Sequence, residues 1–435
     1  MKAISNELLD RFRSEYDSDS HARTMTAAAS KTDITDLAYL PMEAAKLSGP
    51  FRIEVRTRGI TAQEKSGRCW AYAALNILRE VLADRFNVDE FTLSGNYMAF
   101  YDKLEKANNM LEMAIEYAKE PLDSHIMEFL LGGLGDGGHF DMARDLIRKY
   151  GICPAQAMPE TYASGHTASY RLKIDTLLHK DIAELRRLVK EGKDPQPRKE
   201  EMMSQIYKLQ CIVFGQPPKT FDLTYRDKDQ QYHVLRGLTP QTLYTEYAGS
   251  ALDNLVSVVS EHAQGKEFGH HYVFPYKGSM AEGNVDFINV PFDEVEKLCL
   301  AQLKGGVPVW FGCDCEAFEN RSEGVWDPES FDYDGVLGNI DLSLSKEDRL
   351  DYLDSYANHA MILVGVDLDE EGRPTRWKIE NSWGEEAGRK GYFVCSEHWF
   401  REYVYEAIID TAYLTDEEKA LKETESEVLD PWTSI

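Results

Sequence analysis

The chain has 435 residues and a formal net charge of −27, from 75 acidic and 48 basic side chains. This charge argues against a nucleic-acid partner, because the phosphate backbone is anionic and the sequence has no concentrated run of Lys and Arg. The 43% of hydrophobic residues can bury a large core, and without a run of about eighteen apolar residues no membrane span is expected.

The N-terminal ten residues contain acidic side chains where a signal peptide would have its apolar core. The chain has seven cysteines, an odd number that fits a reducing compartment. Both features predict a cytoplasmic protein. Six of these cysteines are interpreted as buried small hydrophobic residues: Cys153, Cys211, Cys299, Cys313, Cys315 and Cys395. The Cys313–Cys315 spacing is too short for a usual metal site, so no metal or cofactor is expected.

Cys69 stands in the run Ser66-Gly67-Arg68-Cys69-Trp70, directly before a segment with helical spacing. Residues 70–82 are rich in Ala and Leu and repeat apolar residues every three or four positions, which predicts a helix. A helix N-terminus lowers the pKa of a thiol, and the thiolate is the nucleophile in acyl transfer. Gln63, six positions earlier, is placed to donate its amide to the oxyanion beside the Cys69 backbone N–H.

Two further polar residues lie at the ends of predicted strands near the C-terminus. His359 begins the apolar run 360–366, and Asn381 follows the strand 377–380; a third strand is predicted at 391–395. An imidazole can take the thiol proton and later protonate the leaving amine. An Asn that accepts from the other ring nitrogen would orient the imidazole. The pattern predicts a Cys-His-Asn site in a cleft between a helical lobe and a sheet.

Four other segments extend the similarity to known proteins: residues 100–108, 137–142, 217–221 and 311–314. With them the chain resembles, nearly end to end, the bleomycin hydrolase and aminopeptidase C branch of the papain-like cysteine peptidases. The resemblance implies an α+β, papain-like two-lobed fold, in which a helical lobe bears the Cys and an antiparallel β lobe bears the His and Asn. It also implies a large helical insertion and a C-terminal arm.

The resemblance implies catalytic roles for four residues. Cys69 is the expected nucleophile, His359 the base and acid, Asn381 the residue that orients His359, and Gln63 the oxyanion donor.

Five further residues are expected to bind substrate or lie beside it. Trp383 matches an indole that shields the His–Asn hydrogen bond from water. Gly137 and Gly138 match glycines whose backbone pairs with an extended substrate, since small residues allow close approach; taken alone, they could form a plain turn. Asn358 stands where Thr is frequent and is expected to tune side-chain preference. Ile435 would supply a terminal carboxylate.

The interval from Cys69 to His359 is about twice that of simple papain-like proteases, roughly 130–150 residues. The extra residues are expected mainly between 162 and 299, where 172–209 is predicted to form a helical hairpin broken at 194–197. We therefore predict an N-terminal arm and helical lobe at 1–162, a mainly helical insertion and oligomerisation region at 163–300, a β lobe at 301–412, and a C-terminal arm at 413–435.

In the resembling family, the carboxylate of the C-terminal arm binds the free amine of the substrate inside the cleft. Such a charge-assisted contact excludes peptides with a blocked N-terminus. This chain ends Asp430-Pro431-Trp432-Thr433-Ser434-Ile435, with the family's Trp, Asp and Pro in another order and without its small residues. The register of the arm in the cleft therefore remains open.

The leading hypothesis is a cytosolic cysteine aminopeptidase of broad specificity, acting through a thioester acyl-enzyme on peptides with a free N-terminus. Resembling proteins form six-subunit rings, so a homohexamer is expected. One alternative is a cysteine endopeptidase whose cleft is left open by the divergent arm. Another is a non-catalytic nucleic-acid-binding scaffold, against which the intact Cys69, His359, Asn381 and Gln63 count.

Overall fold

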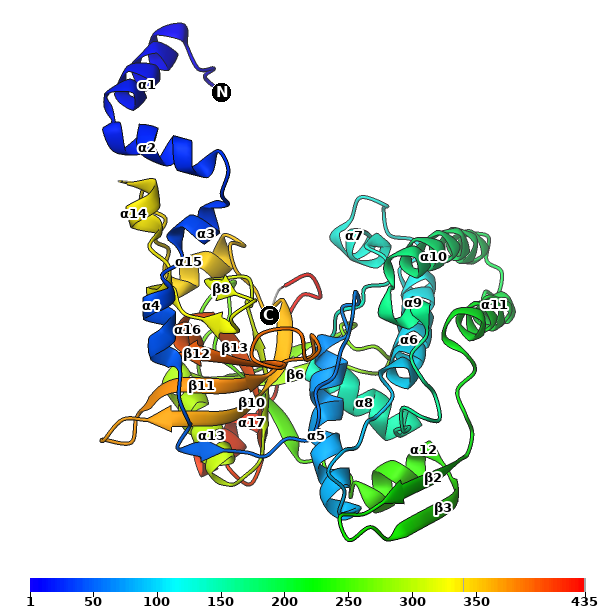
Figure 1. Cartoon of the computed structure of the whole chain (residues 1–435). Coiled ribbons are helices and arrows are strands. Elements are labelled where there is room, and N and C mark those ends of the chain that lie inside the picture. Colours follow the sequence, from blue (N-terminus) through cyan, green and yellow to red (C-terminus); the bar gives the residue numbers. More distant parts are fainter. Residues whose placement is uncertain (339, 434–435) are drawn as a thin grey trace.

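Two lobes, one helical and one built on a large sheet, meet along the helix that begins at Cys69 (Figure 1). The computed structural model describes residues 1–338 and 340–433. The expected α+β, papain-like two-lobed fold is confirmed. No helix among the described residues is long and apolar enough to cross a membrane.

The helical lobe is built around α5 (Cys69–Arg85), whose Ala and Leu side chains are almost all buried. This composition allows close helix packing, and the Ser94 hydroxyl caps the next helix by accepting from Tyr97 N–H at 3.0 Å. The other elements of this lobe are α6 (Gly95–Glu116), α7 (His125–Leu131), α8 (Phe140–Tyr150), α9 (Tyr162–Gly165), α10 (Ala168–Lys190), α11 (Gln196–Phe214), β2 (Phe221–Arg226), β3 (Tyr232–Leu238), α12 (Pro240–Thr242) and η2 (Leu243–Tyr247).

In the β lobe, the described residues form one sheet of 12 strands in the order β14-β5-β6-β4-β13-β7-β10-β11-β12-β9-β8, with β1 paired to β10. Most neighbours are antiparallel, whereas β4–β6, β5–β14 and β9–β12 are parallel. The strands are β1 (Ile53–Glu54), β4 (Leu255–Val259), β5 (His270–Phe274), β6 (Val285–Asn289), β7 (Val309–Cys313), β8 (Glu319–Asn320), β9 (Val325–Trp326), β10 (His359–Leu368), β11 (Pro374–Glu380), β12 (Tyr392–Ser396), β13 (Val404–Asp410) and β14 (Glu427–Val428).

Strand β10 is apolar along most of its length because both of its faces are buried. Ala360, Ile362 and Val364 belong to the core shared with α5. Met361 and Leu363 point into a second core, against α13 (Phe292–Lys304). The predicted strands 360–366, 377–380 and 391–395 are confirmed as β10, β11 and β12.

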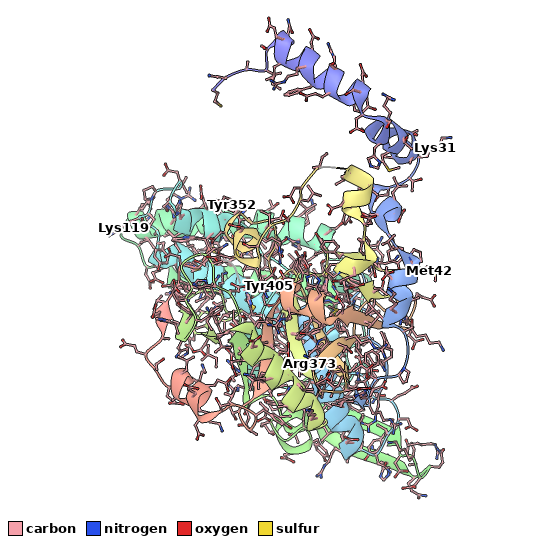
Figure 2. All side chains as sticks on the ribbon, turned by 90° about the vertical axis from the view of Figure 1, so that its left-hand side faces the viewer. Lys31, Met42, Lys119, Tyr352, Arg373 and Tyr405 are labelled. Carbon is pink, nitrogen blue, oxygen red and sulfur yellow. The ribbon has the colours of Figure 1, made fainter. Side chains whose placement is uncertain are left out.

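Shorter helices border the sheet and connect it to the two ends of the chain. The helices α1 (Asn6–Ser18) and α2 (Ser20–Ala29) have no buried residue and project from the body as an arm. Figure 2 shows Lys31 where this arm joins the body, and Tyr405 inside the β lobe. The remaining helices are α3 (Ile34–Ala38), α4 (Pro41–Ala44), η1 (Ala45–Leu47), η3 (Pro328–Ser330), α14 (Tyr333–Leu337), α15 (Lys346–Asp351), α16 (Glu397–Tyr403) and α17 (Asp416–Lys422).

The region between the two halves of the site combines helices and strands. The predicted helical hairpin is present as α10 and α11, joined at 191–195. Strands β4, β5 and β6, which also lie within 163–300, belong to the main sheet. The four proposed domain ranges remain predictions. The C-terminal arm forms α17 and then β14, which pairs with β5 through Glu427 opposite Tyr272.

Candidate active site

Cys69 is the first residue of α5 and only 8% exposed. No side chain caps this helix end, so the backbone N–H groups of its first turn, next to the thiol, have no capping partner. Burial raises the pKa of Cys69, and the backbone N–H groups of Ala360 and Trp70 act against this rise. The helix dipole was expected to lower the pKa of Cys69, but the effect of desolvation is larger and the net shift is upward.

His359 is held at the start of β10 by a hydrogen bond from its Nε2 to Asn381 Oδ1 at 2.9 Å. The same oxygen accepts the Ser382 backbone N–H at 2.7 Å, which fixes the amide so that its oxygen faces the imidazole. Both side chains are buried, and burial lowers the pKa of His359 to about 4. Among the described residues no hydrogen bond is recorded at Nδ1, so this nitrogen is available for proton exchange.

Trp383 covers the imidazole, as the resemblance implies for the shielding indole. Its ring lies 4.8 Å from the His359 ring, with the two planes at 28°. Phe393 contacts the same indole edge-to-face, with the ring centroids 5.6 Å apart. The loop is further fixed by the hydrogen bond from Gly384 N–H to Thr61 O at 3.0 Å.

Gln63 joins the two lobes near Cys69. Its Nε2 donates to Ser66 O at 2.6 Å, and its Oε1 accepts from Ser382 Oγ at 2.7 Å. The main chain repeats the link, since Gln63 N–H donates to Ser382 O at 2.8 Å. A primary amide has two N–H donors, so one remains for an oxyanion.

The two predicted substrate-binding glycines have different environments. A Cβ built at Gly138 would lie 2.5 Å from Trp70 Cε2 and 2.8 Å from Met142 Sδ, so packing excludes any side chain there. A Cβ at Gly137 would meet nothing within 4 Å, which leaves this backbone open to an approaching chain. Substrate binding at these two glycines remains a prediction.

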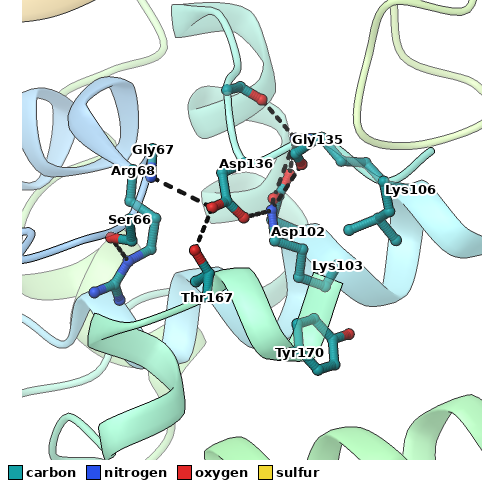
Figure 3. Close-up of polar contacts among 12 residues, drawn as sticks. Ser66, Gly67, Arg68, Asp102, Lys103, Lys106, Gly135, Asp136, Thr167 and Tyr170 are labelled. Atoms are coloured by element: carbon teal, nitrogen blue, oxygen red, sulfur yellow. Dashed lines mark hydrogen bonds and ion pairs between the residues drawn. The ribbon is translucent and has the colours of Figure 1, made fainter. Parts of the chain in front are cut away.

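A buried network of charged side chains from α6 holds the loop at residues 135–137 in place (Figure 3). Lys103 Nζ contacts Asp136 Oδ1 at 2.9 Å and donates to Gly135 O at 2.8 Å. Lys106 Nζ donates to Gly137 O at 2.6 Å and pairs with Asp102 at 3.0 Å. The loop backbone is thereby tied to α6 at two carbonyls.

Asp136 extends this network to Gly67 and Trp70, on either side of Cys69 in the sequence. Its carboxylate accepts from Thr167 Oγ1 at 2.5 Å and weakly from Gly67 N–H at 3.4 Å, while its carbonyl accepts from Trp70 Nε1 at 2.9 Å. Burial acts to raise the pKa of Asp136, but the Lys103 ammonium and the Thr167 hydroxyl bring it down to about 2. Sequence reasoning missed these residues, although the distinctive run 100–108 contains both lysines.

A cavity of about 250 Å³ adjoins the glycine loop, and Gly137, Met110, Met113, Phe129 and Lys277 are among the residues that line it. Lys277 Nζ donates to the Thr433 carbonyl at the cavity rim.

The C-terminal arm reaches this cavity by a defined path. Leu429 N–H donates to Val273 O at 2.9 Å, and the Trp432 ring contacts the His125 ring edge-on at 5.4 Å. Ile435, the predicted source of the carboxylate, lies outside the described residues.

Asn358 is engaged at both ends of its amide. Its Nδ2 donates to Asp314 Oδ1 at 2.6 Å, and its Oδ1 accepts the Cys315 N–H at 3.0 Å. The side chain therefore orders the loop after β7, beside the imidazole. Its influence on side-chain preference remains a prediction.

Known proteins share this architecture over the whole chain. A sequence model of the Peptidase C1-like family matches residues 3–435. Aminopeptidase E of Lactobacillus helveticus is 37% identical over 431 residues, covering 98% of both chains. Aminopeptidase C of Lactococcus lactis subsp. lactis is 36% identical over 432 residues, covering 99% of this chain and 98% of that one.

A solved structure shows the same fold. The crystal structure of PepW from Lactobacillus rhamnosis has a TM-score of 0.96 and 37% sequence identity, and the match covers 100% of this chain and 98% of that one. With the helix-borne thiol, the strand-borne imidazole and the full-length family match, the chain belongs to the Peptidase C1-like family and is a papain-like cysteine peptidase.

Proposed function

We propose that the chain is a cytosolic cysteine aminopeptidase of broad specificity that acts through a thioester acyl-enzyme. The observation that carries this proposal is the oriented His359–Asn381 pair, at 2.9 Å, in the lobe that faces the Cys69 helix. Relatives named aminopeptidase along nearly the whole chain support it. The seven free thiols support the cytosolic setting.

The geometry supports the following sequence of steps. Cys69 Sγ gives its proton to His359 Nδ1 and attacks the acyl carbon, while the free amide N–H of Gln63 and the Cys69 backbone N–H bind the oxyanion. His359 then returns the proton to the leaving amine, and the thioester forms. Water, deprotonated by His359, hydrolyses the thioester and releases the free amino acid.

Burial decides how the nucleophile forms. It raises the pKa of Cys69 and lowers the pKa of His359, so each group taken alone stays neutral. A thiolate beside an imidazolium is different, because each charge stabilises the other where water is excluded. We therefore infer that the ion pair forms as a unit, and that its two apparent pKa values belong to the pair.

The C-terminal arm supports exopeptidase action. Its described end reaches the cavity beside Gly137, where Lys277 binds the Thr433 carbonyl. Two residues beyond Thr433, the terminal carboxylate of Ile435 is proposed to bind the substrate ammonium. An arm in this position shortens the cleft on the acyl side, so that one substrate residue fits before the scissile bond.

The test uses a peptide with a free amine and its N-acetylated twin. We expect the wild type to cleave only the free-amine peptide, one residue from its N-terminus, and a variant truncated after Pro431 to accept both. The Cys69→Ala variant, which should cleave neither peptide, is the negative control. If the wild type already cleaves the acetylated peptide at internal bonds, the endopeptidase alternative is correct instead.

We propose that the chain assembles as a homohexamer, as the resembling proteins do. The α1–α2 arm supports self-association, because Phe12 and Tyr16 are 44% and 43% exposed on a helix that buries none of its residues. Light scattering coupled to size exclusion measures the mass of the assembly. Deletion of residues 1–29 is expected to lower that mass, and an unchanged monomer in both samples would contradict the proposal.

A further inference from the structure

Arg321 follows β8 at the tip of the β8–β9 hairpin and lies against the indole that covers the catalytic imidazole. Its guanidinium carbon is 4.0 Å from the centre of the Trp383 ring. The same indole lies 4.8 Å from the His359 ring. The Arg321 guanidinium therefore contacts one indole, Trp383, that also contacts the imidazole of His359, the proposed proton-transfer residue.

The charge of Arg321 acts on Glu319 and His359 but forms no close ion pair among the described residues. The side chain is exposed, and among the described residues no carboxylate lies within 4.0 Å of it, whereas Arg58, Arg79 and Arg376 each form ion pairs. Glu319, on the same hairpin, remains partly buried, and burial raises its pKa to about 7 although Arg321 acts to lower it. Glu319 Oε1 also has no hydrogen-bond partner among the described residues.

The position of Arg321 corresponds to the leaving-group side of the site. The acyl part of a substrate lies toward Gly137 and the C-terminal arm, in the helical lobe. The leaving amine must lie at His359, in the β lobe, because this residue protonates it. One extended residue spans about 3.3–3.6 Å, so the C-terminus of a one- or two-residue leaving product can reach the outer edge of Trp383.

We propose that Arg321 binds the C-terminal carboxylate of short peptides, and that the enzyme therefore prefers dipeptides and tripeptides with a free carboxylate. A planar guanidinium is suited to this task, since it donates two parallel N–H bonds to a carboxylate. Its contact with the Trp383 ring restricts the side chain before substrate binds. The inference rests on the proposed aminopeptidase function and adds the class of substrate.

Bound carboxylate would also act on the catalytic pair. Burial is the main reason for the low pKa of His359, and Arg321 adds to it. A carboxylate on Arg321 would cancel part of that effect and favour the imidazolium that protonates the leaving amine. Substrates without the carboxylate lose both the contact and this assistance.

The experiment compares Leu-Ala and Leu-Ala-Ala with their C-terminal amides, in the full-length wild type and in Arg321→Met. We expect the wild type to have a kcat/KM about five- to tenfold higher for the acids than for the amides. In Arg321→Met this ratio should fall to about one, while Arg321→Lys should keep part of it. Added salt should reduce the ratio in the wild type, because the contact is exposed.

Arg389 provides a matched control. It is an exposed arginine on the neighbouring turn, and its Nε donates to the Glu323 carbonyl at 3.2 Å. Arg389→Met should leave the acid-to-amide ratio unchanged.

The readout separates carboxylate binding from a structural role. An Arg321→Met enzyme that loses equal activity on acids and amides, with the ratio intact, would overturn the inference and leave the aminopeptidase proposal standing. If the wild type released no N-terminal residue from any of the four peptides, the proposed function would fail and the inference with it.

Discussion

Replacing Gly138 by Ala tests whether close packing at the glycine loop positions the nucleophile. The new methyl group would lie 2.5 and 2.7 Å from Trp70 Cε2 and Cδ2, and 2.8 Å from Met142 Sδ. Carbon atoms in normal contact are about 3.5–4.0 Å apart, so the indole or the loop must move by about 1 Å. Trp70 is 1% exposed and is anchored through its Nε1 to Asp136 O at 2.9 Å, which resists such a movement.

Overpacking of this kind costs about 1–3 kcal/mol. The lower entropy of the unfolded chain with Ala offsets about 0.4–1 kcal/mol. We therefore expect Gly138→Ala to lower the free energy of unfolding by about 1–2 kcal/mol. Because Trp70 follows Cys69 directly, kcat should fall as well.

Gly137→Ala is the matched control, because its methyl group would meet nothing within 4 Å. Its free energy of unfolding should equal that of the wild type or exceed it by up to about 1 kcal/mol, while KM should rise, since the methyl group occupies the face where the substrate backbone approaches. Urea unfolding followed by tryptophan fluorescence measures stability, and steady-state kinetics on a free-amine peptide measures activity. Equal unfolding midpoints for wild type and Gly138→Ala, or an equal loss in both variants, would refute the reasoning.

Two further predictions concern buried charge. Glu380→Gln should destabilise the protein by about 1.5–3 kcal/mol, because Arg79, which contacts Glu380 at 2.8 Å with both side chains at most 2% exposed, would keep only Glu80, at 2.7 Å, as an ionic partner among the described residues. Glu54→Gln, in the more exposed pair with Lys378, should cost under about 1 kcal/mol in the same denaturation assay; similar losses would contradict the role of burial. For His359, whose pKa is lowered from 6.5 to about 4, the unfolded state binds the proton more readily. This contribution to stability is therefore complete above pH 6.5 and is lost as the pH falls through 4. His359→Gln should accordingly lose less stability than the wild type between these pH values. If the free energies of unfolding of the two proteins fall in parallel with pH, groups other than His359 dominate.

Local sequence was sufficient for the elements that carry the predicted site. The Ala- and Leu-rich run after Cys69 became α5, and the apolar run after His359 became β10. Both follow from spacing, because a helix repeats every 3.6 residues and a strand buried on both faces is apolar throughout. The pairing of His359 with Asn381 was also expected, since a thiol nucleophile requires an oriented base.

The sequence by itself determined the fold class and the class of enzyme, a cysteine peptidase, and it supplied the candidate residues for the chemistry, because motif and periodicity are properties of neighbouring residues. Only the tertiary structure decided which distant side chains meet. Lys103 and Lys106 reach the loop at Gly135 and Gly137 because α6 passes beneath it. Arg321 lies on Trp383 because β9 pairs with β12 at the edge of the sheet, which brings the β8–β9 hairpin next to the Trp383 loop. Burial, which reversed the expected pKa shift of Cys69, also arises only when both lobes close around the thiol.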